Sequence, residues 1–393
     1  MGLWKQGLEA AYYVLVASAL VKIIYVQYLC EETSLAPRHH NHDVIKNPLD
    51  PSKRPQQPTY PNQQSMKQSK QPQHPNKHPQ ATENTHPLVF VGGHPRSGTT
   101  LLRAMLDAHG DVRCGEETHI VPKVASLWDF SKGTSRDLVR LMSQGGLIQE
   151  VMDRAVAKFL LRVIRRDSSK AVRLCNKDPF VMMNAVYLHR LFPNSKFIFV
   201  IRDGRAAIHS AVSRSVTIMD YNLASYEESL RMWNWATYIM QQECEELGPH
   251  SCLPVYYEHL ILQPRRVMRS VLRFLDLPWR EHVLHHHKFV DKTSGGISLS
   301  SSEKSTSQVR RARYTDALTS WVGRLPFHLL QDMDVVAPML AALGYDAHAN
   351  PPPYHRLVYT WGSQLLNGSA ARHPVRTFLS ALHHRTNEHS IGI

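Results

Sequence analysis

Residues 87–123 decide the fold of this chain, and they read PLVFVGGHPRSGTTLLRAMLDAHGDVRCGEETHIVPK. Residues 88–91 form a short, uncharged run of β-formers, which predicts a buried strand. Apolar residues recur at helical spacing over 101–109, which predicts a helix. The glycine-rich turn between them lets backbone N–H groups approach an anion at the start of that helix. This order of strand, loop and helix predicts an α/β phosphate-loop architecture.

The loop differs from the nucleotide-binding pattern GxxxxGK[ST] in one position. Gly93 and Gly98 have the spacing of that pattern, but Thr99 stands where it has lysine. Arg96 supplies a cation inside the loop, and a guanidinium can bind an oxyanion through two parallel hydrogen bonds. The loop therefore predicts an oxyanion site and disfavours an ATPase or a kinase. A plain strand-to-helix turn with a solvent-facing arginine is the alternative.

A second anion site is predicted after another buried strand, expected at residues 196–201 (KFIFVI). Arg202 follows that strand directly. A helix that begins near Arg205 places Ser210 and Arg214, four residues apart, on one face. These side chains predict a convergent anion pocket, with a salt-bridged surface helix as the alternative.

The chain resembles the tyrosylprotein sulfotransferase family in a series of ordered motifs. The likeness covers roughly residues 87–353 and begins with PRSGTT, AMLDAH and CGEET. It continues through LCNKDPF, LFPNSKF, RDGRA, LPVYYE and GYDAHANPP. The resemblance implies a phosphate-loop-like sulfotransferase fold of the α/β class, with a central parallel β-sheet flanked by helices. It also implies transfer of sulfonate from 3′-phosphoadenylyl sulfate (PAPS) to tyrosine hydroxyls in acidic segments of secreted and membrane proteins.

The resemblance assigns both anion sites to this cofactor. The 3′-phosphate belongs to the pocket around Arg202, and Tyr257 lies near the adenine or the 3′-phosphate. A second phosphate site distinguishes such a cofactor from ATP, which argues against a kinase. The implied cofactor-binding residues are Arg96, Ser97, Gly98, Thr99, Thr100, Arg202, Ser210, Arg214, Tyr257 and Ser305.

Two adjacent carboxylates, Glu116 and Glu117, follow the loop helix, and adjacent residues cannot share a direction. The resemblance makes Glu117 the general base that takes the phenolic proton and leaves Glu116 structural. Two solvated surface glutamates are the alternative. Arg96, Lys177 and Ser305 are implied to stabilise the charge on the transferring group. In-line displacement by these residues requires no metal.

Three positions depart from the family pattern. The family's peptide-binding segment usually has arginine at both ends, and here His119 and Lys123 replace them. Lys123 can still act as a point charge opposite acidic residues of the substrate. Ser320 stands where the family has a lysine that contacts the cofactor. His119 and Ser320 keep one alternative open, a non-catalytic luminal binding protein that retains the fold. A glycan sulfotransferase, which would share both cofactor loops, is the other.

The N-terminal part of the chain predicts a membrane anchor and a stem. Residues 10–29 are interrupted only by Lys22 and Gln27 and are long enough to span a bilayer. A lysine and the free amine precede them, so residues 1–9 are expected to be cytoplasmic and the rest luminal. We expect an uncleaved signal anchor, with a cleaved signal peptide as the alternative. Residues 30–86 are poor in apolar side chains and predict a disordered stem.

The expected location is the Golgi membrane, in a single-pass type II orientation. The catalytic domain (87–353) is then luminal and is followed by a tail (354–393). A net charge of +13 would suit nucleic acid, but a luminal protein meets none, so an acidic substrate and an anionic cofactor explain it better. The basic face of the helix expected over 264–275 is interpreted as solvated. The resemblance also implies a homodimer.

Four of the five cysteines lie in the expected catalytic domain: Cys114, Cys175, Cys244 and Cys252. In an oxidising lumen they should pair, and the sequence alone leaves three connectivities open. The resemblance implies Cys114–Cys175 and Cys244–Cys252. Asn367 lies in an Asn-Gly-Ser sequon, which fits a secretory route.

Overall fold

A computed structural model describes residues 85–128, 149–166, 171–218, 221–290, 296–300, 305, 309–311 and 315–362. The predicted cytoplasmic tail, the anchor, nearly all of the stem and residues from 363 onward lie outside these ranges. Within them, no helix is both long enough and apolar enough to cross a membrane. The described residues all belong to one unit, Asn76–Ile393.

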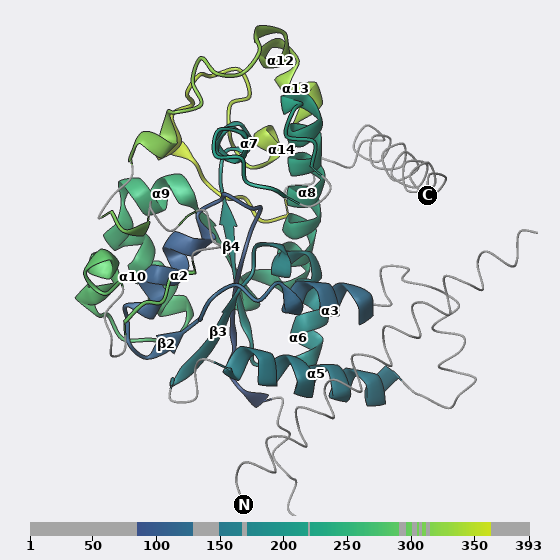
Figure 1. Cartoon of the computed structure of the whole chain (residues 1–393), viewed down its shortest axis with the longest axis vertical. Coiled ribbons are helices and arrows are strands. Elements are labelled where there is room, and N and C mark those ends of the chain that lie inside the picture. The colour runs from purple at the N-terminus through teal and green to yellow at the C-terminus, as the bar shows by residue number, and fades with distance from the viewer. Residues whose placement is uncertain are drawn as a thin grey trace, which may run out of the picture. The chain divides into compact units, whose positions relative to one another are not determined.

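The centre of this unit is a five-stranded sheet in the order β2–β3–β1–β4–β5, in which every neighbouring pair is parallel (Figure 1). The strands are β1 (Val89–Gly92), β2 (Val112–Arg113), β3 (Arg173–Lys177), β4 (Lys196–Ile201) and β5 (Cys252–Tyr256). Because all strands run the same way, their carboxyl ends lie at one edge of the sheet. The predicted parallel α/β fold is confirmed.

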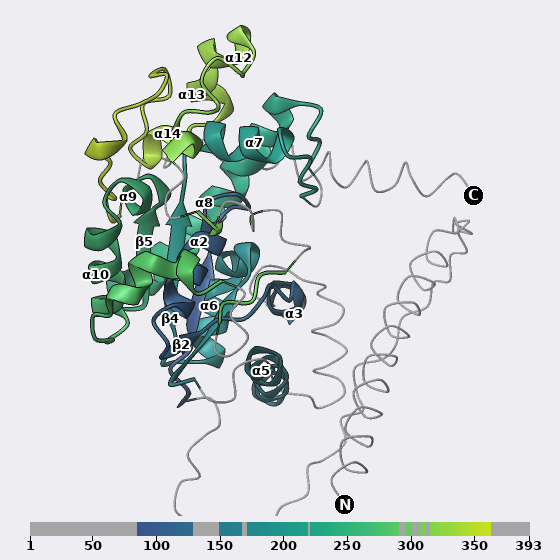
Figure 2. The same cartoon turned by 60° about the vertical axis from the view of Figure 1, so that its left-hand side comes forward.

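Helices cover both faces of the sheet (Figures 1 and 2). On one face lie α2 (Thr99–Asp107) and α10 (Pro264–Phe274), and on the other lie α5 (Gln149–Arg165), α6 (Ala185–Leu191) and α8 (Tyr226–Ser251). Strand β1 contributes to both cores: Phe90 packs with α5, α6 and α8, whereas Val89 and Val91 pack with α2 and α10. A strand that is buried on both faces has apolar residues throughout, which explains why residues 88–91 form an uninterrupted apolar run in the sequence.

Shorter elements complete the described part of the chain. These are α3 (Ile120–Trp128), η3 (Pro179–Asn184), α7 (Gly204–Val212), α9 (Tyr257–Leu262), η4 (Glu281–Lys288), η5 (Thr315–Leu318), α12 (Phe327–Gln331), α13 (Met333–Val336), α14 (Met339–Ala342) and η6 (Tyr354–Arg356). One prediction about them is wrong. Helix α7 ends at Val212, and Ser215 then adopts a left-handed backbone with φ 49°, so Arg214 lies in a turn rather than on the helix.

Two disulfides confirm the pairing that the resemblance implied. Cys114 in the turn after β2 is bonded to Cys175 in β3, 61 residues away. Cys244 near the end of α8 is bonded to Cys252 at the start of β5, 8 residues away. The first bridge therefore fixes the turn that carries Glu116 and Glu117 to the strand that carries Lys177.

Removing the two disulfides should destabilise the fold unequally. A cross-link lowers the entropy of the unfolded chain more when it closes a longer loop. We expect the double change Cys114→Ala with Cys175→Ala to cost about 4 kcal/mol and Cys244→Ala with Cys252→Ala about 2.5 kcal/mol. Denaturant titration of both variants measures this, and equal losses, or a larger loss for the short loop, would contradict it.

Candidate active site

The predicted site residues meet at the carboxyl edge of the sheet. The loop 93–98 follows β1, Lys177 ends β3, Arg202 follows β4 and Tyr257 follows β5. The topology thus brings together segments that lie far apart in the sequence. Ligands of open parallel sheets bind at this edge, where the strands end and the helices begin.

Two glycines set the path of the loop. At Gly98, φ is 97° and a Cβ would lie 2.2 Å from the ring of Tyr257. At Gly93, φ is 152° and a Cβ would lie 2.2 Å from the carbonyl oxygen of Val200 in β4. Neither position has room for a side chain, so the backbone passes close to β4 and to Tyr257 before α2 begins.

Arg96 joins the two predicted anion sites. Its Nε donates to the hydroxyl of Ser210 at 3.2 Å, and its Nη1 donates to the hydroxyl of Ser305. Nη1 of Arg202 donates to the carbonyl oxygen of Arg96 at 2.7 Å. The backbone of Arg96 has φ 73°, a left-handed conformation that residues with a side chain seldom adopt. The two sites therefore form one continuous arrangement.

Positive charge accumulates in this arrangement. Burial, followed by the nearby charges of Arg202 and Arg214, lowers the pKa of Arg96 to about 10. Nε of Arg202 is buried and has no hydrogen-bond partner among the residues that the structure describes. Like charges held close together in a poorly solvated place are costly, and a bound anion relieves that cost. The cluster therefore fits a ligand that carries several negative charges.

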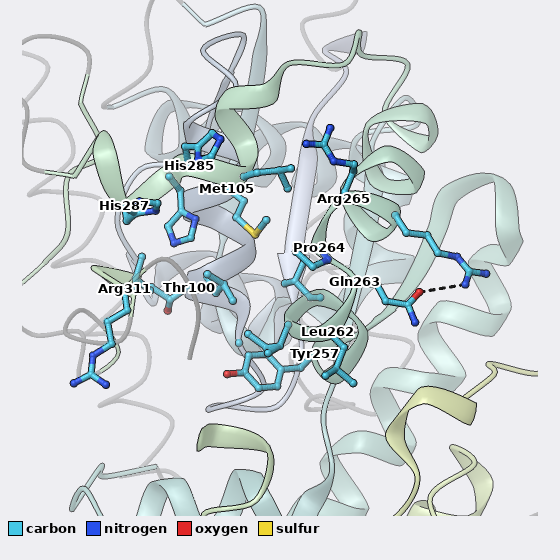
Figure 3. Close-up of a pocket in the computed structure, with 18 of the residues that line it drawn as sticks. Thr100, Met105, Tyr257, Leu262, Gln263, Pro264, Arg265, His285, His287 and Arg311 are labelled. Atoms are coloured by element: carbon cyan, nitrogen blue, oxygen red, sulfur yellow. Dashed lines mark hydrogen bonds between the residues drawn. The ribbon is translucent and has the colours of Figure 1, made fainter. Parts of the chain in front are cut away.

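A cavity of about 1020 Å³ opens beside the cluster (Figure 3). Figure 3 shows Thr100, Tyr257 and Arg311 around one part of it and Arg265 and His285 toward another. The guanidinium of Arg202 lies over the ring of Tyr257, 4.6 Å from its centroid. The cavity is large enough for a nucleotide-sized ligand.

The basic face of α10 is exposed to solvent, as interpreted, and its arginines also line this cavity. Its arginines are Arg265, Arg266, Arg269 and Arg273. Arg265 is ion-paired with Glu281, and the guanidiniums of Arg265 and Arg269 lie 5.6 and 5.3 Å from the ring centroid of Trp279. Helical periodicity showed that these arginines share a face, but it does not show what stands opposite that face.

Glu117 points inward, with only 14% of its side chain exposed. Its Oε1 is paired with the fully buried ammonium of Lys177, which also donates to the hydroxyl of Thr100 at 3.3 Å. Lys177 thereby connects the predicted base to the first turn of α2 and to the wall of the cavity.

Glu116 points elsewhere, as expected for the neighbour of Glu117. It accepts a hydrogen bond from the hydroxyl of Ser298, whose carbonyl oxygen accepts one from Arg103 of α2 at 2.8 Å. These contacts hold residues 296–300 beside the loop helix. The structure therefore gives Glu116 a structural role.

His119 and Lys123 lie at the outer rim of the site. The side chain of His119 is 65% exposed, and its Nε2 is 3.6 Å from Oε2 of Glu117. Lys123 is exposed on α3, four residues further along. Both side chains are accessible to a large substrate that approaches Glu117 from solvent.

Sequence reasoning missed two charged residues near the site. Asp178 is fully buried, accepts a hydrogen bond from the backbone N–H of His119 at 3.0 Å, and has a pKa raised by burial. Arg324 lies near His209. Burial lowers the pKa of that histidine most, and the positive charges of Arg324 and Arg202 lower it further. Asp178 directly follows Lys177, which was a usable signal; nothing in the sequence links Arg324 to α7.

A buried network of hydrogen bonds and one ion pair fixes the segment that directly follows Arg202. Glu258 accepts hydrogen bonds from the backbone N–H of Asp203 and from the hydroxyl of Tyr345, each at 3.0 Å. Asp203 is ion-paired with Arg205 at 2.9 Å, which also donates to carbonyl oxygens of the 346–349 segment. The network therefore fixes the end of β4 to the C-terminal part of the described chain.

This network should make stability depend on pH. Burial raises the pKa of Glu258 to about 7 from the ordinary 4.5. Between those values the folded chain keeps a proton that the unfolded chain has lost, so the free energy of unfolding falls as pH rises through this window, by up to about 3 kcal/mol. Unfolding titrations between pH 5 and pH 8 should show this fall in the wild type and less of it in Glu258→Gln. Parallel profiles would contradict the assignment.

Comparisons with known proteins identify relatives of this chain. The model of the sulfotransferase family matches residues 87–281. Protein-tyrosine sulfotransferase 1 of Danio rerio is 50% identical over 270 residues, which cover 69% of this chain and 75% of that protein. Protein-tyrosine sulfotransferase 2 of Gallus gallus is 49% identical over 268 residues, 68% of this chain and 72% of that protein.

Among solved structures, a sulfotransferase domain from the curacin biosynthetic pathway is 17% identical with a TM-score of 0.45, over 65% of this chain and 98% of that domain. The sequence relatives are much nearer, at 50% and 49% identity. The chain shares about half of its aligned residues with these proteins over more than two thirds of their length. It therefore belongs to the protein-tyrosine sulfotransferase family.

Proposed function

We propose that this protein transfers sulfonate from PAPS to the hydroxyl of tyrosine residues in acidic segments of secreted and membrane proteins. One observation carries the proposal. The inward-facing carboxylate of Glu117 is connected through Lys177 to Thr100 at the start of α2, next to the cluster of Arg96 and Arg202. The relatives named above are protein-tyrosine sulfotransferases, which supports the same substrate class.

The cluster of arginines fits the donor because PAPS carries negative groups on both the 3′ and the 5′ oxygen of its ribose. Arg96 and the backbone of residues 97–100 would hold the phosphosulfate end at the start of α2. Arg202, Ser210 and Arg214 would hold the 3′-phosphate, with Tyr257 beside the nucleoside. The bound donor supplies the sulfonate group; binding and orientation come from these residues.

The chain's own residues then supply acid–base and electrostatic catalysis. Tyrosine's phenol has a pKa near 10, so a carboxylate that accepts its proton assists attack on sulfur. Glu117 takes that proton while the phenolic oxygen bonds to sulfur and the bond from sulfur to the donor's phosphate oxygen breaks. Arg96, Lys177 and Ser305 stabilise the negative charge on the oxygens involved. The hydrogen bond between Arg96 and Ser305, and that from Lys177 to Thr100, already orient them.

The expected setting of this activity is the Golgi lumen. Residues 10–29 would anchor the protein as a single-pass type II membrane protein, residues 30–86 would act as a stem, and the catalytic domain would be luminal. Two disulfides support an oxidising compartment. The homodimer implied by the resemblance is part of the same proposal.

The test is sulfate transfer by the full chain. Labelled PAPS is incubated with an acidic peptide that contains tyrosine and with a matched peptide that has phenylalanine instead. We expect label on the first peptide alone. Label on a sugar acceptor in place of the peptide would indicate a glycan sulfotransferase. Donor binding without transfer to either acceptor would indicate a non-catalytic binding protein.

A further inference from the structure

One imidazole and two carboxylates form a cluster at the rim of the site: Glu117, His119 and Asp178. One ligand atom from each residue lies within 4.8 Å of the other two. The nearest approaches are 3.6 Å between His119 Nε2 and Glu117 Oε2, and 3.8 Å between His119 Nδ1 and Asp178 Oδ1, so the ring lies between the two carboxylates and a metal would take one of its two nitrogens. The cluster spans two segments, the turn after β2 and the residue after β3.

One ligand atom from each residue within 4.8 Å is close to the spacing that a small divalent cation requires. Zinc binds histidine nitrogen and carboxylate oxygen at about 2.0–2.2 Å, so neighbouring ligand atoms of a tetrahedral site lie about 3.3–3.5 Å apart. The side chain of His119, which is 65% exposed, would turn so that a single ring nitrogen faces both carboxylates. The open side of the cluster leaves the fourth position to water or to a substrate atom.

The two carboxylates are already held in place by surrounding groups. Oδ2 of Asp178 accepts hydrogen bonds from the amide of Asn176 at 3.0 Å and from the hydroxyl of Thr118 at 3.2 Å. Its Oδ1 accepts the backbone N–H of His119 and faces the imidazole. Hydrogen bonds of this kind orient ligands in metal sites and reduce the cost of ordering them.

Lys177 forms an ion pair with one carboxylate oxygen of Glu117, and the other oxygen faces His119. It is paired with Oε1, whereas Oε2 is the oxygen that approaches His119. Two carboxylates and one ammonium leave a net negative charge, which favours a cation. The histidine is decisive, because a neutral imidazole nitrogen can ligate a metal, whereas an arginine in its place would keep its proton and could not.

We propose that Glu117, His119 and Asp178 bind a zinc ion, and that the bound ion blocks the carboxylate of Glu117. Mixed nitrogen and oxygen ligands with an open position are typical of exchangeable zinc sites. Binding itself is independent of the proposed sulfotransfer. Its consequence, inhibition, rests on the proposed function, because a carboxylate that ligates zinc no longer accepts the phenolic proton.

Binding is tested on the full chain, purified without a polyhistidine tag. Zinc is titrated in competition with a chromophoric chelator, for the wild type, His119→Arg and His348→Arg. His348 is a matched control: its side chain is 57% exposed and lies 3.8 Å from the single carboxylate of Asp334. We expect His119→Arg to lose one zinc equivalent or to weaken it at least about tenfold, and His348→Arg to match the wild type. Identical titrations for the wild type and His119→Arg, or an equal loss in His348→Arg, would overturn the site.

Inhibition is tested by adding zinc to the sulfate-transfer assay, with each protein compared with its own zinc-free rate. Wild type and His348→Arg should lose transfer as zinc is added and regain it with a chelator, whereas His119→Arg should keep its rate at the same zinc concentrations. Equal zinc sensitivity of all three proteins would refute the proposed block. A wild type that transfers no sulfate even without zinc would refute the proposed function, and the titration above would still decide the metal site.

Discussion

Glu117→Gln is expected to lower the rate of sulfonate transfer to a tyrosine peptide at least about a hundredfold. Glutamine keeps the size of the side chain, and its carbonyl oxygen can still accept the hydrogen bond from the buried ammonium of Lys177. It cannot accept the phenolic proton. The loss should therefore fall on kcat, while the affinity for adenosine 3′,5′-bisphosphate stays within about twofold because the arginine cluster is untouched.

Glu116→Gln is the matched control for this change. The same chemical substitution one residue earlier affects only the contact with Ser298. We expect less than about a tenfold loss of kcat, since a glutamine oxygen can still accept from that hydroxyl. Similar losses of kcat in both variants would contradict a general base at Glu117. They would show instead that the rate depends on the total negative charge of the turn.

Arg96→Lys is expected to lower kcat/KM by about a hundredfold to a thousandfold. A lysine presents one compact ammonium, and it cannot contact Ser210 and Ser305 from two separate nitrogens as the guanidinium does. Part of the loss should appear as weaker binding of adenosine 3′,5′-bisphosphate, because Ser210 and Ser305 would no longer be oriented.

The control for this substitution is Arg231→Lys on α8. Arg231 is exposed and forms an ordinary ion pair with Glu227 four residues away. We expect its kinetic constants to stay within about twofold of the wild type, since such pairs contribute little. An Arg96→Lys protein with near wild-type kcat/KM would mean that the loop cation does not contact the transferring group.

The sequence predicted the strands best where burial is complete on both faces. The run KFIFVI matches β4 residue for residue, because a central parallel strand has no exposed position to interrupt it. Gly98 was a reliable marker for a different reason: the ring of Tyr257 leaves no room for a Cβ. The end of α7 was missed, because the left-handed backbone at Ser215 has no glycine to signal it.

The site was predictable in its parts and not in its connections. The loop arginine and the residues after β4 were visible as separate anion sites, but the bond from Arg96 to Ser210 joins positions 114 residues apart. The same is true of the contact between Lys177 and Thr100, which depends on β3 lying beside β1. Neither local periodicity nor motif spacing contains that information.

The central claim is that two oxyanion sites, around Arg96 and around Arg202, face one cavity next to Glu117. A crystal structure of the full chain with adenosine 3′,5′-bisphosphate tests it most directly. We predict one phosphate against residues 96–100, the other against Arg202 and Ser210, and the carboxylate of Glu117 beside the first. A nucleotide with either phosphate in bulk solvent, or bound away from this cavity, would contradict the account.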